Sequence, residues 1–327
     1  MKVPAPSGIL GAPLISTAAR RRWVRLLVLG SALAVISWGT MNKWPLSLNL
    51  LRFYPKKLGS AAAGWGASRT LPPGLRAAVL GKFAATYGLN MEEAEHPLLD
   101  YPTLQALFTR RLKPGLRPQA ELTTGAVNSP VDGRIMAAGR IEAGQAIQAK
   151  GLPYAITELL KHDPEARRFE GGQFLTLYLS PKDYHRIHVP FQGLVTAVGR
   201  VEGELWPVND ASTGHVPRLY VRNRRATWVA TGTGADEGLE VAAVLVGATH
   251  VGGVIIDGRW LGGRELPRNG ALAVPGLACA PGEDLGTFQF GSTVVLLIGG
   301  PRAADWIPAG VNGPVRVGQR LGAFANP

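Results

Sequence analysis

Residues 290–298 read Phe-Gly-Ser-Thr-Val-Val-Leu-Leu-Ile, a turn of small residues that opens a continuous apolar run. The acidic, turn-rich stretch Pro-Gly-Glu-Asp-Leu-Gly stands just ahead of it at 281–286. An aliphatic run bounded by turn residues is typical of a buried strand. We therefore expect Ser292 to lie at a sharp turn where such a strand begins. Most Gly-Ser-Thr turns are only turns, so a chemical role needs support from the rest of the chain.

Short apolar runs punctuated by glycine continue through the C-terminal two thirds of the chain. With 42 Gly and 25 Pro among 327 residues, the composition favours a loop-rich body of strands. We expect strands at 133–141, 174–179, 194–201, 219–231, 239–246, 251–256 and 294–298, and a short helix at 154–160.

The region before this body has helical periodicity, from about residue 73 to residue 112. Its clearest predicted helix begins after Thr103 as N-cap, places Leu104, Leu107, Phe108 and Leu112 on one face, and ends before Pro114. The fold class predicted is α+β, with N-terminal helices and a membrane-interacting segment beside a mostly antiparallel β body. We divide the chain into an arm (1–57), a helical region (58–126) and a catalytic body (127–327).

The net charge of +12 belongs entirely to the N-terminal part. Residues 1–91 contain 12 Lys and Arg and no acid, whereas residues 92–327 contain 23 basic and 23 acidic residues. An apolar stretch at 26–38 has basic residues on both sides and tryptophans at 23, 38 and 44, as a membrane interface selects. Because aliphatic rather than stacking aromatic residues separate these charges, the pattern does not favour nucleic-acid binding.

The type of membrane contact stays open at this point. The 19 residues from 23 to 41 could nominally cross a bilayer, but Arg25 shortens the fully apolar part. Three interpretations are open: a retained anchor, a cleaved signal peptide and a helix buried in the protein. No small-x-small cleavage site follows promptly, which favours the anchor.

Three segments of the body carry residues suited to chemistry. Asp132 lies in the turn Ser-Pro-Val-Asp-Gly, where an Asp commonly bonds only its own backbone. His185 and His188 lie three residues apart in Tyr-His-Arg-Ile-His, which lacks a third ligand at a usual spacing, so we expect no metal site. The single cysteine, Cys279, excludes an intrachain disulfide. With Ser292, these side chains could form a proton-relay set, which is recognised by geometry rather than order.

The same three segments resemble the signature segments of the phosphatidylserine decarboxylase family. Further matching stretches are Lys-Gly at 150–151 with Tyr154, Gly-Glu-Leu at 203–205 through Asn209, Leu-Tyr-Val-Arg-Asn at 219–223, and Val-Gly-Ala-Thr at 246–249. The similarity runs in order from about Tyr101 to Leu297. Two departures, Phe290 where the family usually has Leu and Val131 where it usually has Ala, both keep an apolar residue beside the reacting group.

The resemblance implies an enzyme that decarboxylates phosphatidylserine to phosphatidylethanolamine and CO2. Its electron sink would be a pyruvoyl group made from Ser292 after cleavage between Gly291 and Ser292, giving chains 1–291 and 292–327. His188 would take the hydroxyl proton, Asp132 would orient its imidazole, and His185 would handle a proton during decarboxylation.

The implied partners are a phospholipid, a membrane and the two chains of one precursor. The implied location is membrane-associated, at the cytoplasmic face of a bacterial-type inner membrane. A membrane-associated Ser-His-Asp lipid hydrolase without self-cleavage is the alternative, although no Gly-x-Ser-x-Gly elbow surrounds Ser292. A non-enzymatic β-barrel carrier module would need none of these residues.

Overall fold

The computed structural model of the protein describes residues 56–121, 123–148, 151–164, 166–249, 253–289, 292–310 and 313–325. The arm expected at 1–57 lies almost wholly outside the described residues, and so do Phe290 and Gly291. Among the helices of the described ranges, none has the length and apolar character needed to cross a membrane.

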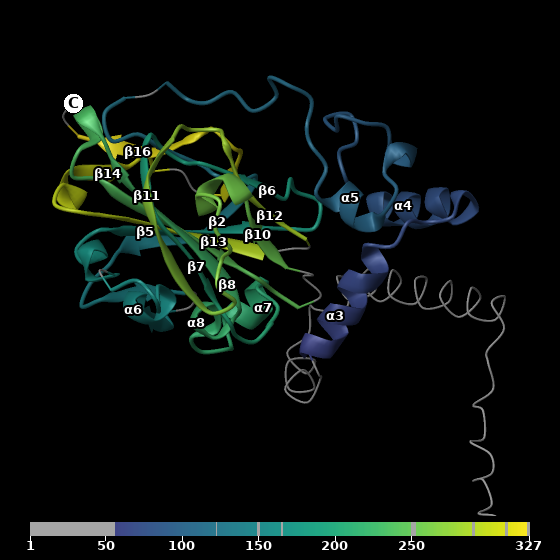
Figure 1. Ribbon diagram of the computed structural model, residues 1–327, viewed down its shortest axis with the longest axis horizontal. Helices are drawn as coiled ribbons and strands as arrows, with labels where there is room; N and C mark the ends of the chain where they lie inside the picture. Colours follow the sequence, from purple (N-terminus) through teal and green to yellow (C-terminus); the bar gives the residue numbers. More distant parts are fainter. Residues whose placement is uncertain are drawn as a thin grey trace, which may run out of the picture.

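The described chain forms a few helices and a mostly antiparallel β body, which confirms the α+β prediction (Figure 1). The helices are α3 (Lys56–Ala67), α4 (Pro73–Tyr87), α5 (Leu104–Phe108), α6 (Ile156–Leu159), α7 (Asp210–Thr213) and α8 (Leu219–Arg222), with 3-10 turns at Leu98–Asp100, Ala166–Phe169, Gly234–Asp236, Gly258–Leu261 and Ala303–Asp305. The strands are β1 (Val127–Asn128), β2 (Gly133–Arg140), β3 (Gln145–Ile147), β4 (Pro153–Ala155), β5 (Gln173–Leu179), β6 (Arg186–His188), β7 (Gly193–Val201), β8 (Arg225–Gly232), β9 (Glu240–Val246), β10 (Val254–Ile256), β11 (Gly270–Cys279), β12 (Asp284–Phe288), β13 (Ser292–Gly299), β14 (Trp306–Pro308), β15 (Gly313–Val315) and β16 (Arg320–Phe324).

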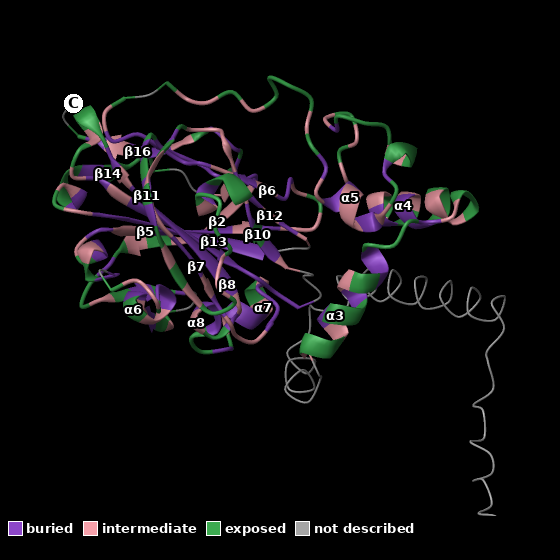
Figure 2. Ribbon diagram, viewed as in Figure 1, coloured by how far each residue is buried: buried purple, intermediate pink, exposed green. Residues whose placement is uncertain are grey.

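An eight-stranded sheet in the order β11-β7-β8-β9-β13-β5-β2-β15 is the centre of the body. Strand β13 lies inside it and is buried along its whole length. Val295 and Leu297 pack into one apolar cluster, which includes helices α3 to α6, whereas Val294 and Leu296 pack into a second cluster with the small sheets β10-β12-β6 and β1-β16-β14. Both faces of the sheet are therefore covered, which explains the continuous apolar run and the buried central strands in Figure 2.

The helical region lies at one end of the body, where α4 and α5 pack beside each other (Figure 1). Thr103 caps α5 as predicted, since its side chain accepts a hydrogen bond of 2.9 Å from the amide of Ala106. The helix nevertheless ends at Phe108, and its predicted extension to Leu112 is wrong. Leu112 instead forms an antiparallel bridge with Ala94, so the chain after the helix is extended and forms part of a cleft described below.

The helix predicted at 154–160 is limited to Ile156–Leu159, because Tyr154 and Ala155 pair with β3 as part of strand β4. One strand prediction also needs correction, and the short strands β1, β3, β4, β6, β12 and β14 to β16 were not predicted. The run predicted as a strand at 219–231 begins as helix α8, because the amide of Leu219 donates to the buried Gln148 side chain at 2.7 Å and fixes a helical turn there. Strand β11 was not predicted, since Pro275 and Gly276 interrupt its pattern. It is an edge strand with an irregular register between Ala273 and Leu277, and such a strand tolerates proline.

One glycine sets the spacing between β2 and β5. A Cβ at Gly133 would lie 2.4 Å from the carbonyl oxygen of Tyr178, closer than real Cβ atoms come. We expect Gly133→Ala to lower the free energy of unfolding by about 1–3 kcal/mol through overpacking. Gly81→Ala is the matched control, because Gly81 lies within α4 with nothing within 4 Å of its added Cβ, and should stabilise by about 1 kcal/mol or less. Urea unfolding of an uncut chain measures both, and equal effects of the two changes would contradict the close approach.

Candidate active site

Ser292 is the first residue of β13, at the point where the buried central strand begins. Its side chain is completely buried, and its Oγ has no hydrogen-bond partner within the described ranges. A buried hydroxyl without a partner costs free energy, and Ser212 and Thr293 share this property, so it is the place of Ser292 directly after Gly291 that distinguishes it. The sequence prediction that Ser292 opens a buried strand is confirmed.

His185 lies in the connection between β5 and β6 and is completely buried. Its Nδ1 donates to the carbonyl oxygen of Asp183 at 2.8 Å, and the ring of Phe108 lies against it with 3.9 Å between centroids. Burial lowers the pKa of His185 to about 3, so the imidazole is neutral. Since Nδ1 carries the proton, Nε2 holds a free lone pair, and no described group bonds to it.

His188 ends strand β6 and has a similar tautomer. Its Nδ1 donates to the carbonyl oxygen of Gly282 at 2.8 Å, and its Nε2 lies 3.2 Å from the hydroxyl of Tyr184, which can donate to it. Burial lowers the pKa of His188 below its ordinary value, partly opposed by the hydrogen bond to Gly282 and by the charge of Asp284. Nε2 is therefore the basic atom of this ring.

Asp132 lies in the turn before β2 and takes part in a nearly buried ion cluster. Its Oδ1 accepts hydrogen bonds of 2.9 Å from Arg117 Nε and from the amide of Val317, and its Oδ2 lies 2.5 Å from Arg117 Nη2. The same Nη2 lies 2.6 Å from Glu93 Oε2. Burial opposes the charge of Arg117, but the hydrogen bonds to the two carboxylates raise its pKa above the ordinary value.

The three predicted segments come together at one end of the adjacent strands β13, β5 and β2. Ser292 faces Leu179 across the β13–β5 pair, and Gly133, next to Asp132, lies against Leu179 from the other side. The amide of His188 donates to Pro130 at 2.9 Å, which joins the histidine strand to the turn that holds Asp132. These contacts bring the backbones of the sites together, although they lie far apart in the sequence.

The hydrogen bond from a ring N–H of His188 to the Asp132 carboxylate that a direct relay needs is not among the contacts of the described residues. Asp132 instead accepts hydrogen bonds from Arg117 and from the amide of Val317. Both ring nitrogens of His188 are hydrogen-bonded to other groups, Gly282 and Tyr184. The relay of Asp132, His188 and Ser292 therefore stays a prediction, as does the role of His185.

Several residues of the site were not predicted from the sequence. Tyr184 belongs to the histidine segment, but no role was predicted for it. Arg117 lies between Pro114 and Pro118, in a stretch whose sequence is typical of an exposed loop. Asp284 Oδ1 lies 3.8 Å from His188 Nδ1 because β12 pairs with β6 in a register that sets Asp284 opposite His188. The acidic turn at 281–286 was the only signal, and it did not identify the partner.

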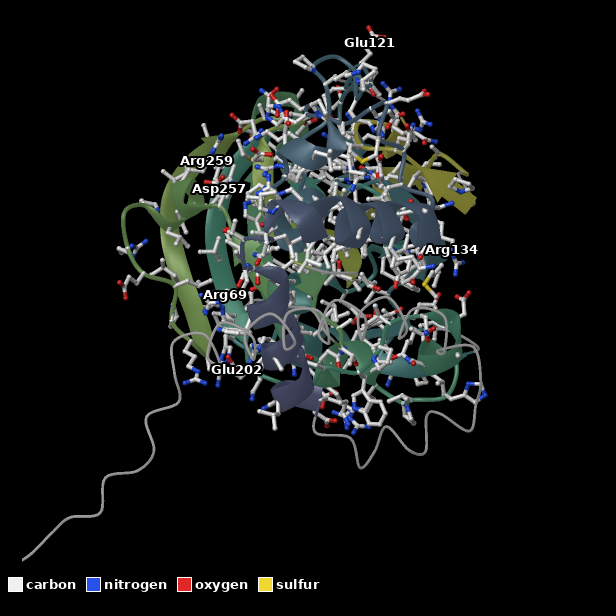
Figure 3. All side chains as sticks on the ribbon, turned by 90° about the vertical axis from the view of Figure 1, so that its right-hand side faces the viewer. Arg69, Glu121, Arg134, Glu202, Asp257 and Arg259 are labelled. Carbon is white, nitrogen blue, oxygen red and sulfur yellow. The ribbon has the colours of Figure 1, made fainter. Side chains whose placement is uncertain are left out.

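A cleft of about 300 Å³ opens beside Asp132, between the helical region and the body. Residues that follow α4 and α5 form one wall, and residues around the starts and ends of β2, β5 and β15 form the other. Its charged lining residues are Glu93, Arg110, Arg117, Asp132, Lys182, Asp183 and Arg316. In Figure 3, Arg134, the residue after Gly133, lies on one side of the molecule, and Asp257 and Arg259 lie on the other.

Comparison with known proteins gives a consistent set of matches. The sequence model described as phosphatidylserine decarboxylase matches residues 104–323. A protein of Anaeromyxobacter sp. named phosphatidylserine decarboxylase proenzyme is 42% identical over 290 residues, covering 86% of this chain and 99% of its own. Proteins of the same name from Myxococcus xanthus and Coxiella burnetii are 37% and 39% identical over 285 residues, covering 85% and 84% of this chain and 98% and 97% of their own.

Proposed function

This chain belongs to the phosphatidylserine decarboxylase family, and from that premise we propose that it cuts itself between Gly291 and Ser292 and then converts phosphatidylserine to phosphatidylethanolamine and CO2. Self-cleavage would make a pyruvoyl group from Ser292 and leave residues 1–291 and 292–327 as two associated chains. The relatives' name, proenzyme, supports a processing step of this kind.

The observation that carries the proposal is the complete burial of Ser292 with its Oγ unpartnered. A lipid hydrolase needs its serine open to an external ester. A buried serine at the start of a central strand instead has the carbonyl of the preceding peptide bond as its natural target. Gly291, without a Cβ, suits a turn that exposes that carbonyl. The hydrolase alternative is therefore the weaker of the two.

The cleavage step uses only atoms of the chain. Ser292 Oγ adds to the carbonyl carbon of Gly291 while a histidine Nε2 takes the hydroxyl proton, and the C–N bond breaks to leave an ester and a free amine. Loss of the Ser292 Cα proton then expels Oγ as the new carboxylate of Gly291. Addition of water and release of ammonia leave a ketone. We assign the first proton transfer to His188, whose Nε2 is its basic atom, and the support of its charged form to Asp132.

A pyruvoyl group supplies a carbonyl that withdraws the electron pair left behind when CO2 departs. The buried, unpartnered Oγ of Ser292 fits a position whose oxygen reacts instead of holding the fold together. His185 holds a free lone pair at Nε2 in a dry environment, so it can carry the proton that the reaction delivers to the substrate carbon. Phe108 covers this ring and excludes water from it.

The substrate also accounts for the exposed apolar side chains on α3, the helix that begins the described chain. A diacyl lipid stays in its bilayer, so the active site must reach the interface. On α3, Leu58 is 70% exposed and Trp65 38% exposed, directly after the basic and apolar arm. We propose that the arm and α3 hold the enzyme on the membrane, at the cytoplasmic face.

The masses of the purified protein and of two histidine variants test the proposal. We expect two chains split at Gly291, the smaller one blocked at its N-terminus. Asparagine can keep the donor at the Nδ1 position but lacks Nε2, so His188→Asn should stay uncut, whereas His185→Asn should be cut yet lose about 10²–10⁴ in kcat. An intact wild-type chain that still decarboxylates the lipid would refute the proposal, and an uncut His185→Asn protein would reverse the two histidine roles.

A further inference from the structure

Arg110 is the unusual charge of the cleft that lies between the helical region and the body. The residue is only 4% exposed and lines the cleft. Its Nη2 donates to the carbonyl oxygen of Lys182 at 3.1 Å, but its Nε and Nη1 have no hydrogen-bond partner in the described part of the chain. A buried guanidinium with unused donors is costly unless an anion completes it.

The other charges of the cleft leave Arg110 without a carboxylate of its own. Arg117 forms ion pairs with both Glu93 and Asp132, and Arg316 lies 3.8 Å from Glu93. The Asp183 carboxylate accepts the amide of Ser180 at 2.7 Å.

Lys182 is exposed on the rim, and within the described ranges no carboxylate forms an ion pair with it. Burial lowers the pKa of Arg110, opposed by the charges of Tyr101, Asp132 and Asp183. Arg110 and Lys182 are therefore the two cations of the cleft lining that have no carboxylate partner within the described ranges.

The position of the cleft relative to Ser292 limits what that anion can be. Ser292, Leu179 and Gly133 follow one another across three adjacent strands, and Gly133 lines the cleft. With neighbouring strands about 4.8 Å apart, Gly133 lies roughly 10 Å from Ser292. A small headgroup attached at Ser292 through its amine would thus extend toward the cleft.

We propose that this cleft binds the phosphate of the serine phospholipid headgroup, with Arg110 and Lys182 as its cationic contacts. The proposal rests on the function proposed above and names the subsite that this reaction would use. The Nε and Nη1 donors of Arg110 are enclosed and lack a partner in the described chain, so an anion that reaches this guanidinium would complete them, and Lys182 adds a mobile charge at the open side.

The phosphate is a better occupant than the other anion of the headgroup, the carboxylate. More bonds separate the phosphate than the carboxylate from the amine, so the phosphate reaches further from residue 292 toward the cleft. The carboxylate loses its charge as CO2 leaves, so an ion pair to Arg110 would stabilise the starting state more than the transition state and slow the reaction. A cation placed on the phosphate holds the substrate without that penalty.

Binding to the uncut Ser292→Ala protein provides the direct test. By calorimetry, glycerophosphoserine and glycerophosphate should bind, serine should not, and inorganic phosphate should bind more weakly than glycerophosphoserine. Adding Arg110→Gln should weaken glycerophosphoserine binding at least tenfold, and Lys182→Gln about threefold to tenfold. Arg69→Gln removes an exposed charge outside the cleft and is the matched control, with no change expected.

The cleaved enzyme supplies a second readout. With short-chain phosphatidylserine, Arg110→Gln should raise KM at least tenfold while self-cleavage and kcat stay near wild type, and retained cleavage shows that the variant folds. If Arg110→Gln does not fold, the exposed Lys182→Gln variant carries the test. Unchanged binding and KM in the folded variants would overturn the proposal, as would serine binding that depends on Arg110 or equal binding of free phosphate and glycerophosphoserine. An uncut, inactive wild-type chain would instead refute the function itself.

Discussion

Replacing Ser292 with alanine should leave a single chain of about 34.7 kDa with no decarboxylase activity above background. The substitution removes the oxygen that must act first as nucleophile and then as leaving group. It removes no hydrogen bond, because Ser292 Oγ has none in the described chain. The fold should therefore survive, and loss of a buried unsatisfied hydroxyl should leave the free energy of unfolding unchanged or slightly raised.

Ser212→Ala is a demanding control for this prediction. Ser212 is also completely buried, and its Oγ is also unpartnered, but it lies in helix α7. The two changes remove the same atom from similar environments, so burial and composition cannot explain a difference between them. Denaturing electrophoresis with intact mass and a CO2-release assay should show two chains and full activity for Ser212→Ala. A cleaved or active Ser292→Ala protein would rule out Ser292 as the cofactor precursor.

Replacing Arg117 with glutamine should destabilise the protein by about 3–5 kcal/mol, the usual effect of removing one partner of a buried ion pair. The Arg117 side chain is 11% exposed, and it holds Asp132 and Glu93 together, at 12% and 22%. Without it, Asp132 and Glu93 lose the cation that joins them, and only the exposed Arg316 remains near Glu93. Because Asp132 belongs to the proposed cleavage machinery, the rate of self-cleavage should fall as well.

Arg134→Gln is the matched control, since it breaks an arginine–aspartate pair on the surface. Arg134 and Asp210 are 42% and 72% exposed, and such pairs contribute about 0–1 kcal/mol. Urea unfolding in the Ser292→Ala background, where the chain stays whole, measures both variants, and the fraction of cut chain over time in otherwise wild-type protein measures processing. Unfolding free energies within about 1 kcal/mol of each other would contradict the interpretation of the cluster as buried.

The long central strands β5, β7, β9 and β13 could be predicted because their apolar runs are bounded by turns, whereas most of the short strands of the small sheets were not predicted. The pattern failed where tertiary contacts decide the local structure. Gln148 fixes the helical turn at Leu219 from 71 residues away in the sequence, and an edge position allows Pro275 within β11. Neither cause is visible in a local window of residues.

The candidate site was predictable as a set of residues but not as a network. Asp132, His185, His188 and Ser292 were found through motif resemblance. The fold brings the backbones of their segments together at one end of adjacent strands. The partners could not be found, because Arg117 and Asp284 reach the site through strand register and a long loop. Arg110 was part of a predicted helix, and only the end of α5 at Phe108 allows it to line the cleft.

The central place of β13 has a consequence for how the processed protein can be recovered. If the chain is cut before Ser292 as proposed, residues 292–327 supply both a middle strand of the large sheet, β13, and its edge strand, β15. The precursor can refold from one connected chain. The mature enzyme would have to rebind a separate peptide and insert it as a strand between β9 and β5. Denaturation of the mature form should therefore be irreversible. The lifetime of its active state would then depend on the rate of unfolding and not on an equilibrium free energy.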